Sequence, residues 1–179
     1  TITAAVGSSV VFESAFSLYM SATYDANAQK VVIVYFDEGG SDYGRAVVGT
    51  VSGTSISFGT PVNFQTARVS QISATYDANA QKVVIVFNDN ANSLGKAVVG
   101  TVSGTSISFG STATFNSSFS SETTAVYDPN TQKVVIAYRD IGNSSYGTAI
   151  VGTVSGTSIS FGSSAVFEST QVRHVSTTY

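Results

Sequence analysis

Short apolar runs alternate with polar turns along the whole chain, and no segment has the 3.6-residue periodicity of an amphipathic helix. The run KVVIVYF (30–36) is apolar at consecutive positions, which is typical of a strand buried on both faces. The segment TSISFG (54–59) mixes Ser and Thr with Ile and Phe, as expected nearer a surface. Turn residues, such as Asp-Ala-Asn-Ala (25–28) and Ser-Gly (52–53), separate these runs. The pattern therefore predicts an all-β protein of short antiparallel strands.

An internal repeat organises these strands. Residues 22–34 and 74–86 both read ATYDANAQKVVIV, and 125–137 are a close variant. A Tyr-Asp landmark recurs at spacings of 51 to 52 residues, at Tyr24, Tyr76 and Tyr127, and Tyr179 continues the series. Each unit predicts four strands, which in the first unit end at Asp25 and then cover 30–36, 46–53 and 54–64. Four antiparallel strands repeated at this length predict blades of a β-propeller, although a β-prism or a fibre of stacked sheets also fits.

The two ends of the chain extend the repeat. Residues 7–14 (GSSVVFES) match 162–169 (GSSAVFES), so 1–14 are predicted to be the last strand of a preceding unit. Residues 169–179 are predicted to be the first strand of a following unit. The chain is then a single repeat domain with three whole blades at 15–65, 66–116 and 117–168. Because propellers close with 4 to 8 blades, we expect a fragment of a longer array or a chain completed by another subunit.

Two resemblances accompany the repeat. The hairpin VGTVSGTSISFGTPVNF (48–64) resembles a degenerate Asp-box hairpin of sialidase-like propellers, with Phe58, Phe109 and Phe161 in place of the motif's Trp. The Asp of the motif is absent from every copy. Over nearly the whole chain, the unit also resembles tandem repeats of tail-fibre-like proteins of marine phages and of bacterial surface proteins. The resemblance implies a propeller fold and a binding role on a virion or cell surface.

Composition narrows the function classes. Charged residues make up 11% of the chain, against roughly 25% in ordinary soluble domains, and the net charge is −3. This balance disfavours a nucleic-acid binder. The chain has no Cys and a single His, which excludes thiolate and His-rich metal centres within it. No apolar run approaches the roughly 18 residues of a membrane span. We expect no cofactor, no metal, no nucleic acid and no membrane insertion.

The candidate site comes from comparing the repeat units with one another. Two sets of segments differ between units, whereas the other turns are nearly constant. They are the connections between units (14–20, 65–71, 117–123 and 169–175) and the loops between the second and third strands (36–45, 88–96 and 139–148). In an antiparallel blade, these two sets lie at the same edge of the sheet. Loops on a rigid scaffold commonly carry recognition, although neutral drift is the alternative explanation.

Aromatic, amide and charged side chains of these segments are the candidate ligand-binding residues. Flat aromatic faces beside Asn and Asp suit sugar rings, so the predicted partner is a glycan or a cell-surface receptor, bound by an extracellular or virion-surface adhesin. The candidates are Phe16, Tyr19, Met20, Glu38, Asp42, Tyr43, Arg45, Arg68, Gln71, Asn90, Asn92, Glu122, Arg139, Asn143, Tyr146, Arg173 and His174.

Other chemistries are less well supported by the sequence. The four Arg residues do not recur at equivalent positions, and no carboxylate pair suits a glycosidase, so we expect no enzyme. Asp37, Asp89 and Asp140 recur after the second strand, where calcium is conceivable, but acceptance of backbone N–H groups is the favoured role. An equivalent role is expected for Asp25, Asp77 and Asp128 in the preceding turn, and the landmark tyrosines are expected to pack between units. The alternatives are a structural repeat of a fibre or oligomeric scaffold, and a hydrolase whose catalytic blades lie elsewhere.

Overall fold

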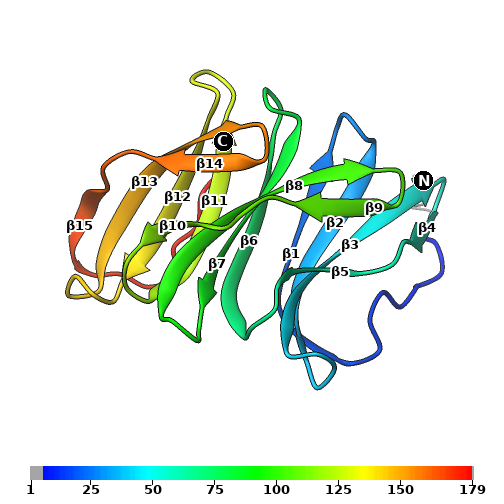
Figure 1. The fold of residues 1–179 in the computed structure, drawn as a ribbon, viewed down its shortest axis with the longest axis horizontal. Helices are drawn as coiled ribbons and strands as arrows, with labels where there is room; N and C mark the ends of the chain where they lie inside the picture. The colour runs from blue at the N-terminus through cyan, green and yellow to red at the C-terminus, as the bar shows by residue number, and fades with distance from the viewer. Residues whose placement is uncertain (1–5, 179) are drawn as a thin grey trace, which may run out of the picture.

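The computed structural model describes residues 6–178, and these form three antiparallel β-sheets without a helix (Figure 1). It follows that the described residues contain no helix able to cross a membrane. The first sheet comprises β1 (Phe16–Asp25), β2 (Lys30–Glu38), β3 (Tyr43–Ser52), β4 (Ser55–Phe58) and β5 (Val62–Gln65). The second comprises β6 (Val69–Asp77), β7 (Lys82–Asp89), β8 (Leu94–Ser103), β9 (Ser106–Phe109) and β10 (Ala113–Asn116). The third comprises β11 (Ser120–Asp128), β12 (Lys133–Asp140), β13 (Tyr146–Ser155), β14 (Ser158–Phe161) and β15 (Ala165–Gln171).

Each sheet repeats the same strand order. In the first sheet, β1 pairs with β2, β2 pairs with β3, and β4 and β5 both pair with β3. The second and third sheets pair their strands in the same way. The predicted all-β class and the order of strands within a unit are therefore confirmed.

The predicted fourth strand is wrong as a single strand, because a bulge divides it. β3 pairs Gly49 with Phe58 and Ala46 with Val62, so three residues of one strand (59–61) face two of the other (47–48). An extra residue of this kind cannot join the regular ladder. Pro61 also has no N–H to donate, although the Gly59 N–H still donates to Val48 O at 2.9 Å.

Adjacent sheets pack face to face through their second strands. Val83, Ile85 and Phe87 of β7 lie in the core shared with the first sheet. Val84 and Val86 of the same strand lie in the core shared with the third sheet. Alternate side chains of a strand point to opposite faces, so a strand between two sheets must be apolar at consecutive positions. This explains the apolar run that the sequence repeats.

The first strands of neighbouring sheets contact one another along one margin. The N–H of Ala74 on β6 donates to Ser21 Oγ on β1 at 3.1 Å. The equivalent Ala125 N–H on β11 donates to Ser73 Oγ at 3.2 Å. The tyrosines do pack between units: Tyr76 OH accepts the Asn27 N–H and Tyr127 OH accepts the Asn79 N–H of the preceding sheet. Tyr24 is exposed, and Tyr179 lies outside the described residues.

Residues 6–14, here called the arm, form no strand but lie on the outer face of the first sheet. The Phe12 ring is 5.2 Å from that of Tyr35 and 5.9 Å from that of Phe58. Equivalent aromatic contacts recur between the sheets: Phe64 packs on Phe87 and Phe109, and Phe115 packs on Tyr138 and Phe161. β5 and β10 are strands because β3 and β8 supply their ladder partners, and the described arm residues have no such partner.

The segment after β15 behaves similarly. Residues 172–178 form no strand, so the predicted first strand at 169–179 is not formed over these residues. Thr177 Oγ1 nevertheless lies 2.9 Å from Thr124 Oγ1 of β11. The remaining residues of the two end predictions, 1–5 and 179, lie outside the described residues.

Glycines allow a close approach between successive sheets, and this predicts a difference between two of them. A Cβ at Gly110 would overlap the carbonyl oxygen of Thr157, whereas a Cβ at the equivalent Gly162 would meet only Val151 O at 4.0 Å. Gly110→Ala should therefore lower the free energy of unfolding by about 2 kcal/mol, since backbone must move to accommodate the methyl group. The matched control Gly162→Ala should stay within about 0.5 kcal/mol of wild type. Urea denaturation measures both, and equal losses would contradict this packing.

Candidate functional site

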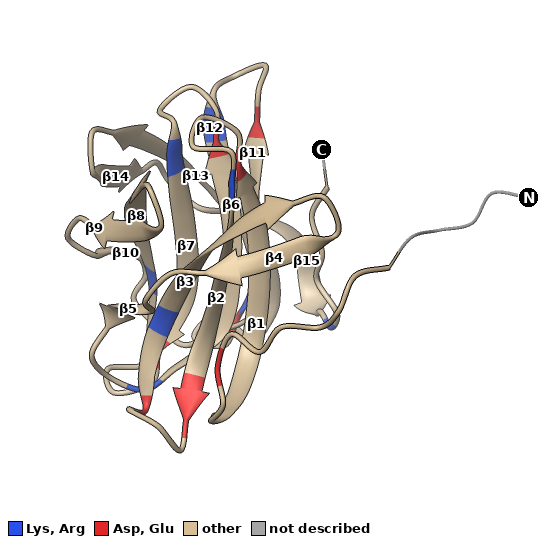
Figure 2. Ribbon diagram, turned by 90° about the vertical axis from the view of Figure 1, so that its right-hand side faces the viewer, with Lys and Arg blue, Asp and Glu red and all other residues tan. Residues whose placement is uncertain are grey.

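The unit-to-unit connections and the second-to-third loops lie at one edge of the sheets, which we call the variable rim (66–68, 117–119 and 172–174 with 39–42, 90–93 and 141–145) (Figure 1). The Asn90 N–H donates to Arg68 O at 3.1 Å, and the Ile141 N–H donates to Phe119 O at 3.2 Å. The turns that the units share between their first and second strands lie at the opposite edge (Figure 1). Charged residues are few and lie mainly near strand ends, toward these two edges (Figure 2). The antiparallel order thus brings the variable segments together.

Several candidates expected in loops lie in strands instead. β1 begins at Phe16, so Tyr19 and Met20 belong to it, and Gln71 and Glu122 likewise lie inside β6 and β11. The prediction of a loop over these residues is wrong, because the ladder continues past a bulge. In β1, the register moves between the pairs Leu18–Phe36 and Ser21–Val34, and equivalent shifts occur in β6 and β11.

The bulge places one candidate of each unit in a left-handed backbone conformation. The φ angles are 51° at Tyr19, 54° at Gln71 and 53° at Glu122. His174, at the same repeat position but in the segment after β15 that forms no strand, has a φ of 57°. Such values are uncommon for residues other than glycine. The Gln71 side chain also accepts the Glu122 N–H at 2.8 Å, which links two neighbouring bulges. The left-handed residue is therefore a regular feature of the three first strands, β1, β6 and β11.

Phe16, Tyr19 and Met20 are exposed on β1. Ile72, which occupies the position of Met20 on β6, is buried against the first sheet, and Thr123 is buried at that position on β11. No other described sheet covers the outer side of β1. The exposure of these three side chains thus follows from their place on an outer sheet.

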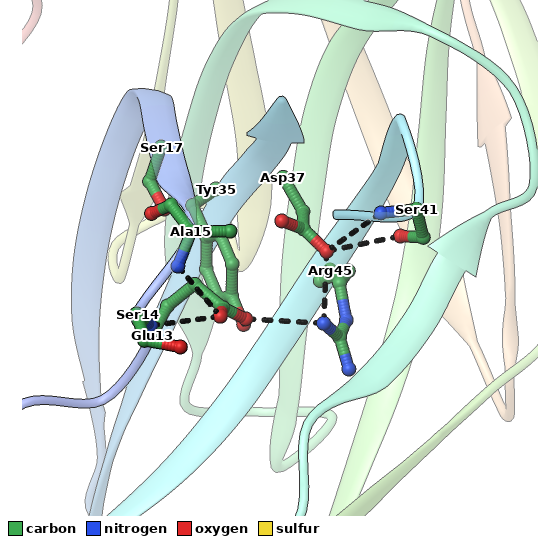
Figure 3. A network of polar contacts seen from close by, with 8 residues as sticks. All are labelled: Glu13, Ser14, Ala15, Ser17, Tyr35, Asp37, Ser41 and Arg45. Carbon is green, nitrogen blue, oxygen red and sulfur yellow. Dashed lines mark hydrogen bonds and ion pairs between the residues drawn. The ribbon is translucent and has the colours of Figure 1, made fainter. Parts of the chain in front are cut away.

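Arg45 is the centre of a polar network beneath the rim (Figure 3). Its NH1 lies 2.9 Å from Asp37 Oδ2 and 3.0 Å from Glu13 Oε2, and Tyr35 OH donates to the same Glu13 oxygen at 3.1 Å. The Ser41 N–H and hydroxyl donate to Asp37 at 3.1 and 3.0 Å. Burial acts to raise the pKa of Asp37, but the hydrogen bonds from Ser41 and Arg45 outweigh it and hold this pKa below its ordinary value. Arg45 thus fixes the first loop.

Asp89 holds the second loop in a similar way. The carboxylate is fully buried and accepts hydrogen bonds from Lys96 Nζ at 2.7 Å and Asn92 Nδ2 at 2.9 Å. The Ala91 N–H donates at 3.1 Å, and Gln65 Nε2 lies 3.5 Å away. Burial acts to raise the pKa of Asp89, but the Lys96 and Asn92 hydrogen bonds and the Lys96 charge keep it below its ordinary value.

The third loop has no cation at this position, because Thr148 replaces Arg45 and Lys96. Asp140 instead accepts the Gly142 N–H at 3.0 Å and Asn116 Nδ2 at 3.1 Å. All three recurrent aspartates accept a backbone N–H in their loop, so the role favoured from the sequence is confirmed. No group of three or more candidate metal ligands occurs among residues 6–178.

The first turns confirm the equivalent prediction for the other aspartate series. Asp25 accepts the Ala28 N–H and Asp77 accepts the Ala80 N–H, each at 2.9 Å. Asp128 accepts Asn130 N–H at 2.9 Å. A carboxylate that accepts an N–H two or three residues ahead fixes the turn locally.

Other candidates contact neighbouring parts of the rim. Arg68 pairs with Glu38 of the preceding sheet at 2.8 Å, and its guanidinium lies 5.0 Å from the Phe36 ring centroid. Asn90 Oδ1 accepts hydrogen bonds from Ser70 Oγ at 2.7 Å and Asn88 Nδ2 at 3.2 Å.

The last unit and the turns hold the remaining candidates. Arg139 donates to Ser145 Oγ at 3.1 Å, and the Asn143 backbone takes part in the third loop's turn. Tyr43 and Tyr146 are half-buried where β3 and β13 begin, and Asp42, Arg173 and His174 are exposed.

Sequence reasoning missed several residues that organise the rim. They are Glu13, Asn88, Lys96 and Asn116, and Glu13 and Asn116 occupy the same position of the repeat, directly after a phenylalanine. That shared position is a signal in the sequence, because the phenylalanine recurs at Phe12, Phe64, Phe115 and Phe167.

Comparison with protein-family models and with curated proteins finds no match for this chain. No pocket is found among the described residues. The loop hydrogen bonds and the exposed side chains of the rim are thus the observations that bear on function.

Proposed function

We propose that the chain is a segment of a β-propeller that acts as a non-enzymatic binding module, recognising a glycan or surface receptor through the variable rim of a cell-surface or virion adhesin. One observation carries this proposal: the loops that differ between units lie at one edge of the sheets, and the turns that the units share between their first and second strands lie at the other (Figure 1). Three face-to-face sheets with adjacent first strands also resemble successive propeller blades.

The most suitable contact residues are those of the first and third loops. Tyr43 and Tyr146 occupy equivalent positions and are half-buried, so each ring can be held by packing while it presents part of its face. The exposed Asp42 and Asn143 lie close to them in sequence and offer groups that bond hydroxyls. Loops fixed by their own hydrogen bonds lose little conformational freedom when a ligand binds.

The proposal is tested with the full chain on a glycan array and against candidate receptor-bearing cells. Tyr43→Ser combined with Tyr146→Ser should weaken binding by about tenfold or more, since aromatic side chains dominate such contacts. Tyr24→Ser, an exposed tyrosine toward the opposite edge, is the matched control and should leave binding unchanged. Equal binding by both variants, or no binding by the wild-type chain, would overturn the rim proposal.

A structural repeat in a fibre or oligomeric scaffold is the second candidate. The observation in its favour is that apolar side chains are exposed on both outer sheets. They are Met20 and Tyr24 on β1 of the first sheet, with Val151 on β13 and Phe167 on β15 of the third. Ordered self-association without binding to sugars or receptors would support this candidate.

A further inference from the structure

We propose that a second copy of this chain docks head to tail on the outer face of the first sheet, with its β15 segment in the site that the arm of the first copy now occupies. We call this surface the arm-binding site; it is formed by Tyr35, Arg45, Thr54 and Phe58. The inference concerns self-association and does not depend on ligand binding at the rim.

The arm occupies a site that recurs between the sheets. Phe12 lies edge-on to Tyr35 and Phe58, as Phe64 lies against Phe109 of the next sheet. Gly7 lies so close to Thr54 that a Cβ would overlap its carbonyl oxygen. Gly59 and Gly110 lie equally close to the equivalent threonines of the following sheets. From Gly7 to Glu13, the arm therefore follows the path of an internal unit-to-unit contact.

The chain carries a second segment suited to this path. Residues 162–169 differ from 7–14 only in having Ala165 in place of Val10. Phe167 is 56% exposed, whereas Phe115 at the same position of the second unit is 6% exposed. Gly162 has open space where Gly110 meets the next sheet. The sequence of residues 162–169 therefore fits the arm-binding site, which lies two sheets away within the same chain.

Charge identifies the first sheet of another copy as the matching surface. The residue after the recurrent phenylalanine is Glu13 in the arm, Gln65 and Asn116 inside the chain, and Glu168 in β15. Glu13 meets Arg45 at 3.0 Å and the Tyr35 hydroxyl at 3.1 Å.

The two inner sites suit a neutral residue instead. The Gln65 amide lies near Asp89, and the Asn116 amide donates to Asp140, which has no lysine or arginine partner. In the first sheet, Arg45 NH1 contacts both Glu13 and Asp37, so one cation holds two carboxylates. A carboxylate in place of Asn116 would approach Asp140 with no cation between them. A carboxylate in place of Gln65 would have to share Lys96, whose Nζ lies 2.7 Å from Asp89. Of the three sheets, the one with Arg45 therefore matches Glu168 best.

The faces around this contact are also matched. Val151 and Phe167 are exposed on the third sheet, but the equivalent Val99 and Phe115 of the second sheet are buried against the third. Tyr24 is exposed on the first sheet, but the equivalent Tyr76 packs on the preceding sheet. Docking would thus repeat an interface that the chain already makes twice. The first strand of the second chain would take the place of residues 172–178, whose Thr177 now lies 2.9 Å from Thr124 of β11. A head-to-tail contact of this kind produces a ring where it closes and a filament where it does not.

The arm competes with the second copy for the same site. Because the arm is tethered, its effective concentration is high, and it favours the separate chain. Weakening the arm should therefore strengthen association between chains. This competition distinguishes docking at the arm-binding site from non-specific contact between apolar faces.

The test uses sedimentation velocity on the full chain. Phe12→Ala combined with Glu13→Ala should lower the self-association dissociation constant by about tenfold or more relative to wild type. Adding Phe167→Ala and Glu168→Ala to that variant should return the dissociation constant to the wild-type value or above it. Adding Ile141→Ala instead should preserve the tighter association, since Ile141 is exposed on the third loop, outside the contacts that recur between the sheets. A monomeric arm variant, or a gain that survives loss of Phe167 and Glu168, would overturn the proposal.

A second measurement leaves the arm unchanged, in case the arm variant fails to fold. A photoreactive phenylalanine analogue at position 167 is mixed with ¹⁵N-labelled wild-type chains and irradiated. Crosslinks should join position 167 to labelled peptides that contain Tyr35 or Phe58, and Glu168→Ala in the photoreactive chain, which leaves the arm and its site unchanged, should reduce their yield. Crosslinks confined to other peptides, or none at all, would overturn the proposal.

Discussion

Phe64→Ala should lower the free energy of unfolding by about 4 kcal/mol. The ring is 6% exposed and lies 5.1 Å from the Phe87 ring and 6.1 Å from the Phe109 ring, with both partners on the next sheet. Truncation removes buried apolar surface, breaks one tilted and one edge-on aromatic contact and leaves a cavity between sheets. Urea denaturation monitored by circular dichroism measures the loss.

Phe167→Ala is the matched control, because Phe167 occupies the same repeat position but is 56% exposed. At concentrations where the chain is monomeric, this change should alter stability by less than about 1 kcal/mol. The comparison holds the residue type and its position in the repeat constant, whereas the following sheet is present at Phe64 and absent at Phe167 among the described residues. Similar losses for Phe64→Ala and Phe167→Ala would show that the ring stabilises its own hairpin rather than the contact between sheets.

The sequence predicted the strands and their order because both depend on local patterns. The consecutive apolar residues at 30–36 and 82–87 require a strand covered on both faces, and the recurrent Asp25 and Asp77 fix the turns that precede them. The bulges were not predictable in the same way. The bulges depend on which residues of neighbouring strands pair, such as Gly49 with Phe58. This register is set by contacts between strands, so the sequence of one strand alone does not predict it.

The edge that carries the candidate site was predictable, but the roles of its residues were only partly so. Antiparallel order alone brings residues 66–68 to the same edge as 90–93. By contrast, one of the two carboxylate partners of Arg45, Glu13, lies 32 residues away in a segment predicted only as a strand. Polar contacts between sheets depend on packing distance, so the sequence did not show that Arg45 and Arg68 are paired with carboxylates of the arm and of β2.

Lys96→Met tests whether such pairing holds the rim, and it should lower the free energy of unfolding by about 3 kcal/mol at neutral pH. The reason is that Asp89 is fully buried, so loss of its cation leaves a desolvated carboxylate with only neutral donors. The control Arg68→Met breaks an exposed pair, with Arg68 54% exposed, and should cost less than about 1 kcal/mol.

The pH dependence of the Lys96→Met effect separates charge from packing. Because the pKa of Asp89 is depressed in the folded state, ionised Asp89 stabilises the fold above its unfolded pKa of about 4, and this contribution is lost as pH falls through the folded pKa. Without Lys96, the folded pKa rises, so the carboxylate no longer provides this contribution. The stability gap between wild type and Lys96→Met should therefore be wide at pH 7 and narrow on acidification below about pH 4, when urea denaturation is compared at each pH. A gap of equal size throughout would mean that Lys96 acts through the packing of its aliphatic stem, and that Asp89 is held by Asn92 and the loop N–H alone.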